Sequence, residues 1–468
     1  MVQMPSNGTI SERLAEYVAG MVLGDFPPEV VAKTKLCILD TIGCMLRGSR
    51  DEVAASLAAH ALRYGPPGPC TIFGHSGSVG PEHAALANGT SAHVLEWDAG
   101  HRPSDNHLGG VVLPATLAMA QVRGSSAAEL LLSVALGYDV MGRIGEAVCL
   151  PRNATPFHGT GTTGVFGSAA AVGKLLGLNA RQLANALGVA GDGASGLREI
   201  SPTGVDCFVL HAGKASQSGI TAALLAAEGF QAPATIIEGR YGFCNAMTPE
   251  ARPELICAEL GQRFAVVECG FKVHACHGGL FTAIDAALWL RTEHNLDPGS
   301  IQRIKVALPE SVRDRYTCQQ QPPPSVAAAR WSISFTVAAA LHDGEVTHRQ
   351  LSQIKLADPG IAALVEKVEL VSDSEVEEIF YAQKRDDPFF FTPCAVEVDC
   401  GGRSYRRLER TPLGYDPLKR GLTQEQVVAK FRSVVDGILS ETQVDRMVDW
   451  VLRLDHGSKV GDLSGILA

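Results

Sequence analysis

Apolar residues recur at helical spacing from Ser11 to about Ala265, and this pattern restricts the possible folds most strongly. The run that begins at Pro28 and the run from Ala127 to Val148 both show it, and Asn179 sits where a helix N-cap is expected. Many of the 49 glycines fall inside these runs. Because small side chains let helix backbones approach closely, the pattern predicts one large, tightly packed helical domain.

The pattern changes near Phe264. Short alternating segments at Ile304-Lys-Val-Ala-Leu and at Ala395 to Tyr405, the latter with a Gly-Gly turn, are typical of strands, and a helix is expected over residues 280–296. Helical spacing returns from Thr423, which begins a capping-box pattern. A chain of 468 residues also exceeds what one core usually serves. We therefore predict a mainly α protein, with a helical domain of residues 1–268 and 408–468 and a smaller α+β domain of residues 269–407.

The charge of the chain excludes some classes of partner. A formal net charge of −10 without a basic cluster disfavours nucleic acid and acidic membranes, so an anionic substrate would need a local positive pocket. No apolar run approaches the ~20 residues of a membrane span, and residues 1–16 lack a signal-peptide pattern, which predicts a cytoplasmic protein. The twelve cysteines contain no CxxC pair, which favours reduced and mostly buried thiols.

The segment from Glu96 to Pro114 is rich in titratable groups and punctuated by glycine and proline. Such loops often hold functional sites, although a solvated polar loop is a comparable alternative. Metal binding is a further alternative, but no HxxxH or HExxH spacing is present in the segment. The candidate residues are Glu96, Asp98, His101, Asp105 and His107.

A second segment, Phe157-His158-Gly-Thr-Gly-Thr-Thr-Gly164, contains a literal GxGxxG. A dinucleotide site is a weak interpretation, because residues 151–156 do not resemble a buried strand and no acidic residue follows about twenty positions later. We expect a glycine-rich helix start with His158 at its edge. A structural role for this histidine is the common alternative.

The third segment, Gly270 to Gly279, lies at the predicted domain junction and leads into a helix. Lys272, His274 and His277 are close together in it, so a ligand carboxylate could meet both a cation and a helix N-terminus. A basic surface loop is the alternative.

The order of these segments resembles the MmgE/PrpD family over nearly the whole chain. The resemblance also rests on Leu36-Cys-Ile-Leu-Asp-Thr-Ile-Gly43, on Asn88 to Asp98, and on Leu210 to Gly219. It implies a large all-helical domain, a smaller α+β domain, a homodimer, and no metal or organic cofactor.

The resemblance also implies roles for single residues. It makes His107, Lys272, His158 and Asp98 catalytic, with His101 as a competitor for the role of His107. Gln217 stands where the decarboxylases of the family have a basic residue, which weakens the case for decarboxylation or a citrate-like tricarboxylate. The residues expected to bind substrate are His277, His101, Gln217, Glu96 and His274.

The family chemistry is removal of a proton next to a carboxylate, which builds negative charge that Lys272 and His277 could stabilise while His107 takes the proton. We expect a lyase that dehydrates a small di- or tricarboxylic acid, like 2-methylcitrate dehydratase. The alternatives are an epimerase like iminodisuccinate epimerase, a cis-aconitate-like decarboxylase, and a non-catalytic carboxylate-binding protein. Lys272→Ala and His107→Ala should each abolish turnover and leave the thermal midpoint nearly unchanged.

Overall fold

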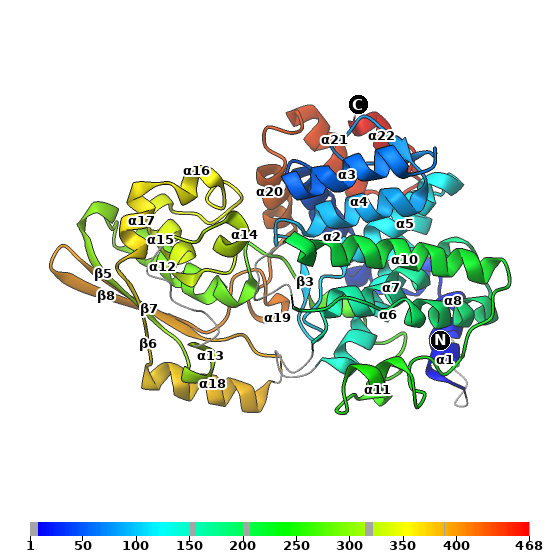
Figure 1. Ribbon diagram of the computed structural model, residues 1–468, viewed down its shortest axis with the longest axis horizontal. Coiled ribbons are helices and arrows are strands. Elements are labelled where there is room, and N and C mark those ends of the chain that lie inside the picture. Colours follow the sequence, from blue (N-terminus) through cyan, green and yellow to red (C-terminus); the bar gives the residue numbers. More distant parts are fainter. Residues whose placement is uncertain (1–7, 150–155, 200–205, 314–321, 388, 468) are drawn as a thin grey trace. The chain divides into compact units, whose positions relative to one another are not determined.

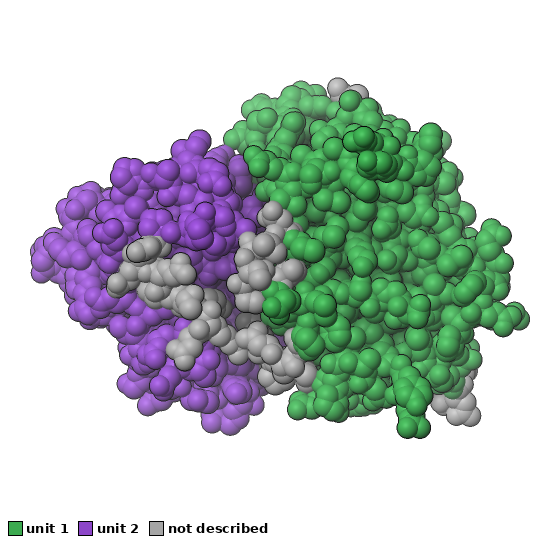
Figure 2. All heavy atoms as spheres, viewed as in Figure 1, with its two compact units in different colours: residues 1–94, 98–269, 423–468 green, residues 95–97, 270–422 purple. Residues whose placement is uncertain are grey.

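The computed structural model describes residues 8–149, 156–199, 206–313, 322–387 and 389–467. The chain divides into two compact units (Figure 2). Unit 1 contains Met1–Val94, Asp98–Cys269 and Thr423–Ala468, and unit 2 contains Leu95–Trp97 and Gly270–Leu422. The chain therefore passes from unit 1 to unit 2 and back within the segment predicted to hold the site.

Unit 1 is helical apart from very short strands (Figure 1). A two-residue antiparallel pair is formed by β1 (Cys70–Thr71) and β2 (Ser78–Val79), and β3 is Gly100–His101. The helices of the first half are α1 (Ile10–Gly20), α2 (Pro28–Gly48), α3 (Glu52–Tyr64), α4 (Pro81–His93), α5 (Gly109–Arg123), α6 (Ala127–Val148), α7 (Gly159–Leu175), α8 (Ala180–Asp192), α10 (Leu210–Ala227) and α11 (Phe243–Met247). The C-terminal helices are α20 (Gln424–Val434), α21 (Glu441–Leu452) and α22 (Asp462–Leu467).

Helix starts follow local capping chemistry. Asn179 caps α8 and Thr423 caps α20, each in a full capping box, which confirms both predicted starts. Helix α1 begins with a capping box between Thr9 and Glu12, so its cap lies two residues before Ser11, where the helical spacing of the sequence starts.

Small residues bring the central helices of unit 1 together. Helices α4, α5, α6, α7 and α10 are buried over most of their length and pack on one another. A Cβ on Gly213 of α10 would collide with the backbone of Leu86 in α4, and a Cβ on Gly219 would collide with Ser168 of α7. Glycine is thus required where these helices cross, as the composition indicated.

Unit 2 is an α+β unit around a four-stranded sheet with the order β6-β5-β7-β8. Figure 1 shows α12 and α15 on one side of this sheet and α18 on the other. Its strands are β5 (Ile301–Ala307), β6 (Val368–Val371), β7 (Cys394–Cys400) and β8 (Arg403–Glu409). Its helices are α12 (Phe281–Glu293), α13 (Glu310–Arg313), α14 (Val326–Ala329), α15 (Ile333–Asp343), α16 (Gln353–Leu356), α17 (Pro359–Val365), α18 (Ser374–Asp386) and α19 (Pro417–Arg420).

The predicted glycine turn makes a hairpin of β7 and β8. Gly401 and Gly402 both have positive φ, as a tight two-residue turn requires, and Val398 pairs with Tyr405 across the hairpin. Strand β5 pairs antiparallel with β7 and parallel with β6. On the sheet, Ala307 and Ala395 pack against Val376 of α18.

The predicted mainly α class is confirmed, and the two units differ in character as expected. Unit 2 continues through Leu422, whereas a boundary after Arg407 would cut β8. None of the described helices combines the length and apolar character needed to cross a membrane. Apart from Cys149 and Cys207, the described cysteines are buried. Residues 151–155 and Cys318, on which sequence predictions also fell, lie outside the described residues.

Candidate active site

The loop between α4 and α5 carries several of the titratable side chains singled out in the sequence. His101 and Asn106 bridge its two arms, and the exposed Asp105 at the turn has a φ of 54°. The loop ends at His107, two residues before α5 begins. Asp98 and His107 therefore stand at opposite ends of a closed loop, which brings them together.

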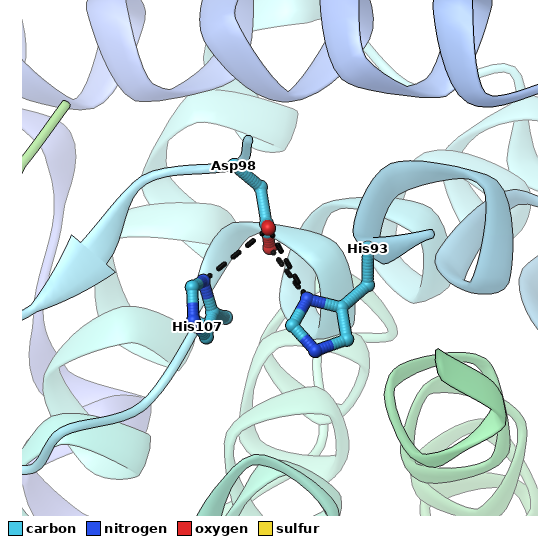
Figure 3. A group of neighbouring side chains, drawn as sticks. All are labelled: His93, Asp98 and His107. Atoms are coloured by element: carbon cyan, nitrogen blue, oxygen red, sulfur yellow. Dashed lines mark hydrogen bonds and ion pairs between the residues drawn. The ribbon is translucent and has the colours of Figure 1, made fainter. Parts of the chain in front are cut away.

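Asp98 lies between two imidazoles (Figure 3). Its Oδ1 is 3.1 Å from Nδ1 of His93, the last residue of α4, and 3.3 Å from Nδ1 of His107. The side chains of Asp98 and His93 are 0% exposed, whereas that of His107 is 11% exposed. Of the two histidines that contact Asp98, only His107 is therefore open to a ligand.

The surroundings of Asp98 favour its charged form. Burial by itself raises the pKa of this carboxyl, but His107 and His93 outweigh it and hold the pKa well below its ordinary value. The first turn of α5 also faces the carboxylate, since a Cβ on Gly110 would lie 3.2 Å from Oδ2. A helix N-terminus stabilises a nearby anion, so Asp98 is a buried carboxylate that accepts hydrogen bonds.

A second buried carboxylate fixes the start of the loop. Asp40 of α2 accepts a hydrogen bond from the backbone N–H of Ala99 at 3.0 Å, and its other oxygen is 2.6 Å from Nζ of Lys430 in α20. Burial raises the pKa of Asp40, and Lys430 opposes that effect. The C-terminal helix α20 thus supports the position of Asp98 through Asp40.

The glycine-rich helix α7 fixes the other end of the loop. The backbone N–H of His107 donates to Oγ1 of Thr160, and the amide of Asn106 donates to Oγ1 of Thr163, both at 3.1 Å. A Cβ on Gly159 would collide with Asn106. The GxGxxG pattern therefore begins a helix, as predicted, and its first glycine makes room for the loop.

His158 lies in a cluster of aromatic rings. As the N-cap residue of α7, it places its Nδ1 3.0 Å from Nδ1 of His211 in α10, and its ring stacks on Phe208 and faces His93 at 5.9 Å. Burial lowers the pKa of His211 to about 4, with help from the charges of His93 and Lys214. His211 is thus neutral near pH 7, and one of the two facing Nδ1 atoms donates while the other accepts.

His101 has different partners from His107. Its Nδ1 is 2.8 Å from Oγ of Ser104 within the loop, and its Nε2 is 3.8 Å from Glu268. The pKa of Glu268 lies below its ordinary value, because His101 and Arg263 outweigh the effect of burial. This geometry favours a structural role for His101 and makes His107 the better candidate for the base.

In unit 2, Lys272 is buried and paired with Glu96. Its Nζ donates to the carboxylate of Glu96 at 3.0 Å and to the backbone oxygen of the same residue at 2.9 Å. Glu96 has a φ of 53°, and the indole of the following Trp97 donates to the backbone oxygen of Val273. The side chains of Glu96 and Trp97 therefore bind the segment Leu95–Trp97 to the rest of unit 2.

The remaining predicted ligands are dispersed. The buried His274 is 3.0 Å from Asp285 of α12, and the half-buried His277 stacks on Trp331 at 4.2 Å between ring centroids. Gln217 is half-buried on α10 of unit 1, six residues after His211. The structure thus joins Asp98 with His107 and Lys272 with Glu96, but it gives His274 and His277 partners that were not predicted.

Sequence reasoning missed His93 and His211. Both lie inside motifs that carried the family resemblance, His93 in Asn88 to Asp98 and His211 in Leu210 to Gly219. His93 is five residues before Asp98 at a helix end, and this spacing was the available signal. No comparable signal links His211 to His158, because the two residues are 53 positions apart in the chain.

Comparison with known families identifies the type of protein. The MmgE/PrpD N-terminal domain matches residues 12–256, and the MmgE/PrpD C-terminal domain matches residues 274–455. The chain belongs to the MmgE/PrpD family. The predicted family is thereby confirmed.

Several curated relatives match almost the full chain. The cis-aconitate decarboxylase-like protein oryM of Aspergillus oryzae is 26% identical over 98% of this chain and 98% of its own length. Human cis-aconitate decarboxylase is 27% identical over 96% of the chain and 92% of its own length. The mitochondrial 2-methylcitrate dehydratase of Yarrowia lipolytica is 25% identical over 96% and 91%. These relatives are lyases by name, which agrees with the prediction of an MmgE/PrpD-type enzyme.

Proposed function

We propose that this protein is a lyase that removes a proton from the carbon next to a carboxylate of a small polycarboxylic acid, with His107 as the base. The observation that carries the proposal is the pairing of the partly exposed His107 with the fully buried Asp98. Asp98 contacts Nδ1, so Nε2 of His107 lies on the far side of the ring and can accept a proton.

Asp98 supports the base in two ways. As an anion 3.3 Å from Nδ1 of His107, it favours the tautomer that carries its proton on Nδ1 and has a free lone pair on Nε2. When Nε2 takes a proton, the imidazolium gains an attractive interaction with a carboxylate in a dry environment. His93 contacts the same carboxylate but is fully buried, which supports a positioning role rather than contact with substrate.

The lead reaction is dehydration of a hydroxy-polycarboxylate. His107 would take the proton from carbon, and the hydroxyl on the neighbouring carbon would leave as water after receiving a proton from His158, which yields a carbon–carbon double bond. Lys272 and His277 are the proposed ligands of substrate carboxylates. Since Lys272 donates to Glu96, binding a substrate carboxylate would exchange one anionic partner for another.

Decarboxylation is the second candidate. Its support is that relatives named as cis-aconitate decarboxylases align with nearly the whole chain. In that reaction the bond to a carboxylate breaks, carbon dioxide leaves, and a proton is delivered to carbon. Gln217 counts against it, because the sequence resemblance leads us to expect a basic residue there.

A substrate panel tests the proposal. The protein is incubated in D₂O with 2-methylcitrate, citrate, cis-aconitate and smaller hydroxy acids, and NMR follows deuterium entry, alkene signals and carbon dioxide. We expect an alkene product from at least one hydroxy acid and none with His107→Ala. Deuterium entry without an alkene would support epimerisation instead. If no compound exchanges or reacts, proton removal beside a carboxylate is wrong for this chain.

Other expected properties stay predictions. The family resemblance implies a homodimer and turnover without a metal or organic cofactor, and the sequence predicts a cytoplasmic location. Gel filtration with light scattering tests the first, and activity after exhaustive chelation tests the last.

A further inference from the structure

We propose that His93, Asp98 and His107 also form a binding site for one divalent transition-metal ion such as Zn²⁺, and that the bound ion blocks the base. Metal binding by itself is independent of the proposed reaction, whereas the loss of activity rests on it.

The positions of the three side chains suit a single ion. Their candidate ligand atoms all lie within 4.8 Å of one another, and the two Nδ1 atoms are 3.1 and 3.3 Å from Oδ1 of Asp98. Ligands at about 2.0–2.2 Å from a tetrahedral ion lie roughly 3.3 Å apart. Both nitrogen–oxygen distances therefore match the spacing of a coordination shell, and both Nδ1 atoms face the carboxylate of Asp98 (Figure 3).

The donor set selects the kind of metal. Two imidazole nitrogens and one carboxylate are typical ligands of Zn²⁺ and of other late first-row ions. Ca²⁺ and Mg²⁺ prefer several oxygen ligands, and the cluster offers one carboxylate. We expect selectivity for Zn²⁺ or Co²⁺ over Mg²⁺.

The burial of the cluster indicates how the ion would be held. Asp98 and His93 are 0% exposed, so an ion would enter from the side of His107. Water or a substrate carboxylate could then take the fourth position. The ion would occupy the space between the two Nδ1 atoms and the carboxylate of Asp98, which would then be paired with positive charge.

Coordination changes the tautomer of His107. A neutral imidazole that binds metal through Nδ1 carries its proton on Nε2. Since Nε2 is the atom proposed to accept the substrate proton, metal-bound His107 cannot act as the base. The same geometry that prepares His107 for proton removal therefore makes the enzyme sensitive to zinc.

Competition with a coloured chelator measures the binding. Chelator-treated protein is titrated with Zn²⁺, and we expect one tight equivalent per chain. Loss of an outer-sphere partner already weakens metal binding by about 10–100-fold, so His93→Gln and Asp98→Asn should each weaken it by at least about tenfold. The controls are His158→Gln, a neighbouring imidazole outside the cluster, and Cys207→Ser, an exposed thiol, which should both keep the wild-type affinity for Zn²⁺. Unchanged affinity in folded His93→Gln and Asp98→Asn would overturn the site.

Cobalt absorption gives a test on the wild-type protein, so it does not depend on the folding of any variant. Bound Co²⁺ should show visible d–d bands without a sulfur-to-cobalt charge-transfer band. A charge-transfer band would assign the metal to cysteine and overturn the proposal. One equivalent of Zn²⁺ should abolish turnover reversibly, whereas full activity with the ion bound at the cluster would overturn the blocking step. Activity of the metal-free protein tests the proposed function separately.

Discussion

Nδ1 of His107 lies 3.3 Å from Oδ1 of Asp98, an oxygen that His93 also contacts. One buried carboxylate thus serves two imidazoles of which only His107 is open to a ligand. His107 and His93 share the same partner, so it is the greater exposure of His107 that distinguishes it as the proposed base from His93, the proposed positioning residue.

The contacts of the loop predict different outcomes for its two histidines. His107→Ala should lower the rate of proton removal by about 10²–10⁴-fold, because it deletes the base. His101→Ala deletes contacts to Ser104 and Glu268, so it should lower the thermal midpoint and reduce the rate less. Deuterium incorporation and thermal melts measure the two effects. The reverse order of rates would make His101 the base.

The Glu96–Lys272 pair changes an expectation drawn from the sequence. Lys272 is only 1% exposed and donates to Glu96, so its replacement leaves a buried carboxylate without this cation. Removing one partner of a buried pair costs roughly 3–5 kcal/mol, and Lys272→Met should therefore lower the free energy of unfolding by about that amount. The sequence-based expectation that Lys272→Ala leaves the thermal midpoint nearly unchanged was made without knowledge of this pair, and we now expect a lower midpoint.

The double variant Glu96→Gln/Lys272→Met is the control for this effect. It removes both charges, so urea unfolding should show less destabilisation than the sum of the single variants. Strictly additive losses would mean that the pair does not couple in solution.

His211 should make stability depend on pH. Its pKa is lowered from 6.5 to about 4, chiefly by burial, so the unfolded chain binds a proton in this range before the folded chain does. The free energy of unfolding should therefore fall as the pH decreases from about 6.5 to 4, with a contribution of up to about 1.4 kcal/mol per pH unit. His211→Gln should remove that part of the slope. His456→Gln, at an exposed histidine, should leave it unchanged, and equal slopes in both variants would contradict the assignment.

Gly159 should be intolerant of a side chain. A Cβ there collides with Asn106, whose loop carries His107, and misplacement of a catalytic group by about 1 Å can cost about 10²-fold in rate. Gly159→Ala should thus lower turnover strongly. Gly465→Ala is the matched control, because it lies in helix α22 with open space around its Cβ position and should be neutral or slightly stabilising. A fully active Gly159→Ala variant would show that the loop adapts.

Local chemistry explains the parts of the fold that the sequence predicted well. The caps at Asn179 and Thr423 depend on residues three positions apart, and the turn at Gly401 depends on backbone freedom, so each can be recognised within a few residues. Asp98 and His107 could be proposed together because one short loop contains both.

Contacts distant in the chain explain what was missed. The partner of Asp40 is Lys430, 390 residues later, and the partner of Glu96 is Lys272, 176 residues later. No pattern of spacing encodes such pairs, and His211 was overlooked for the same reason. The assignment of Leu95–Trp97 to unit 2 likewise depends on the contacts of Glu96 and Trp97 there.

The assignment of Leu95–Trp97 to unit 2, between two stretches of unit 1, has a consequence for gene fragments. A gene fragment that encodes only Gly270–Leu422 would produce Lys272 without the carboxylate of Glu96, and a fragment for unit 1 would carry three residues that belong elsewhere. A fragment of unit 2 that keeps the partner of Lys272 must therefore also include Leu95–Trp97.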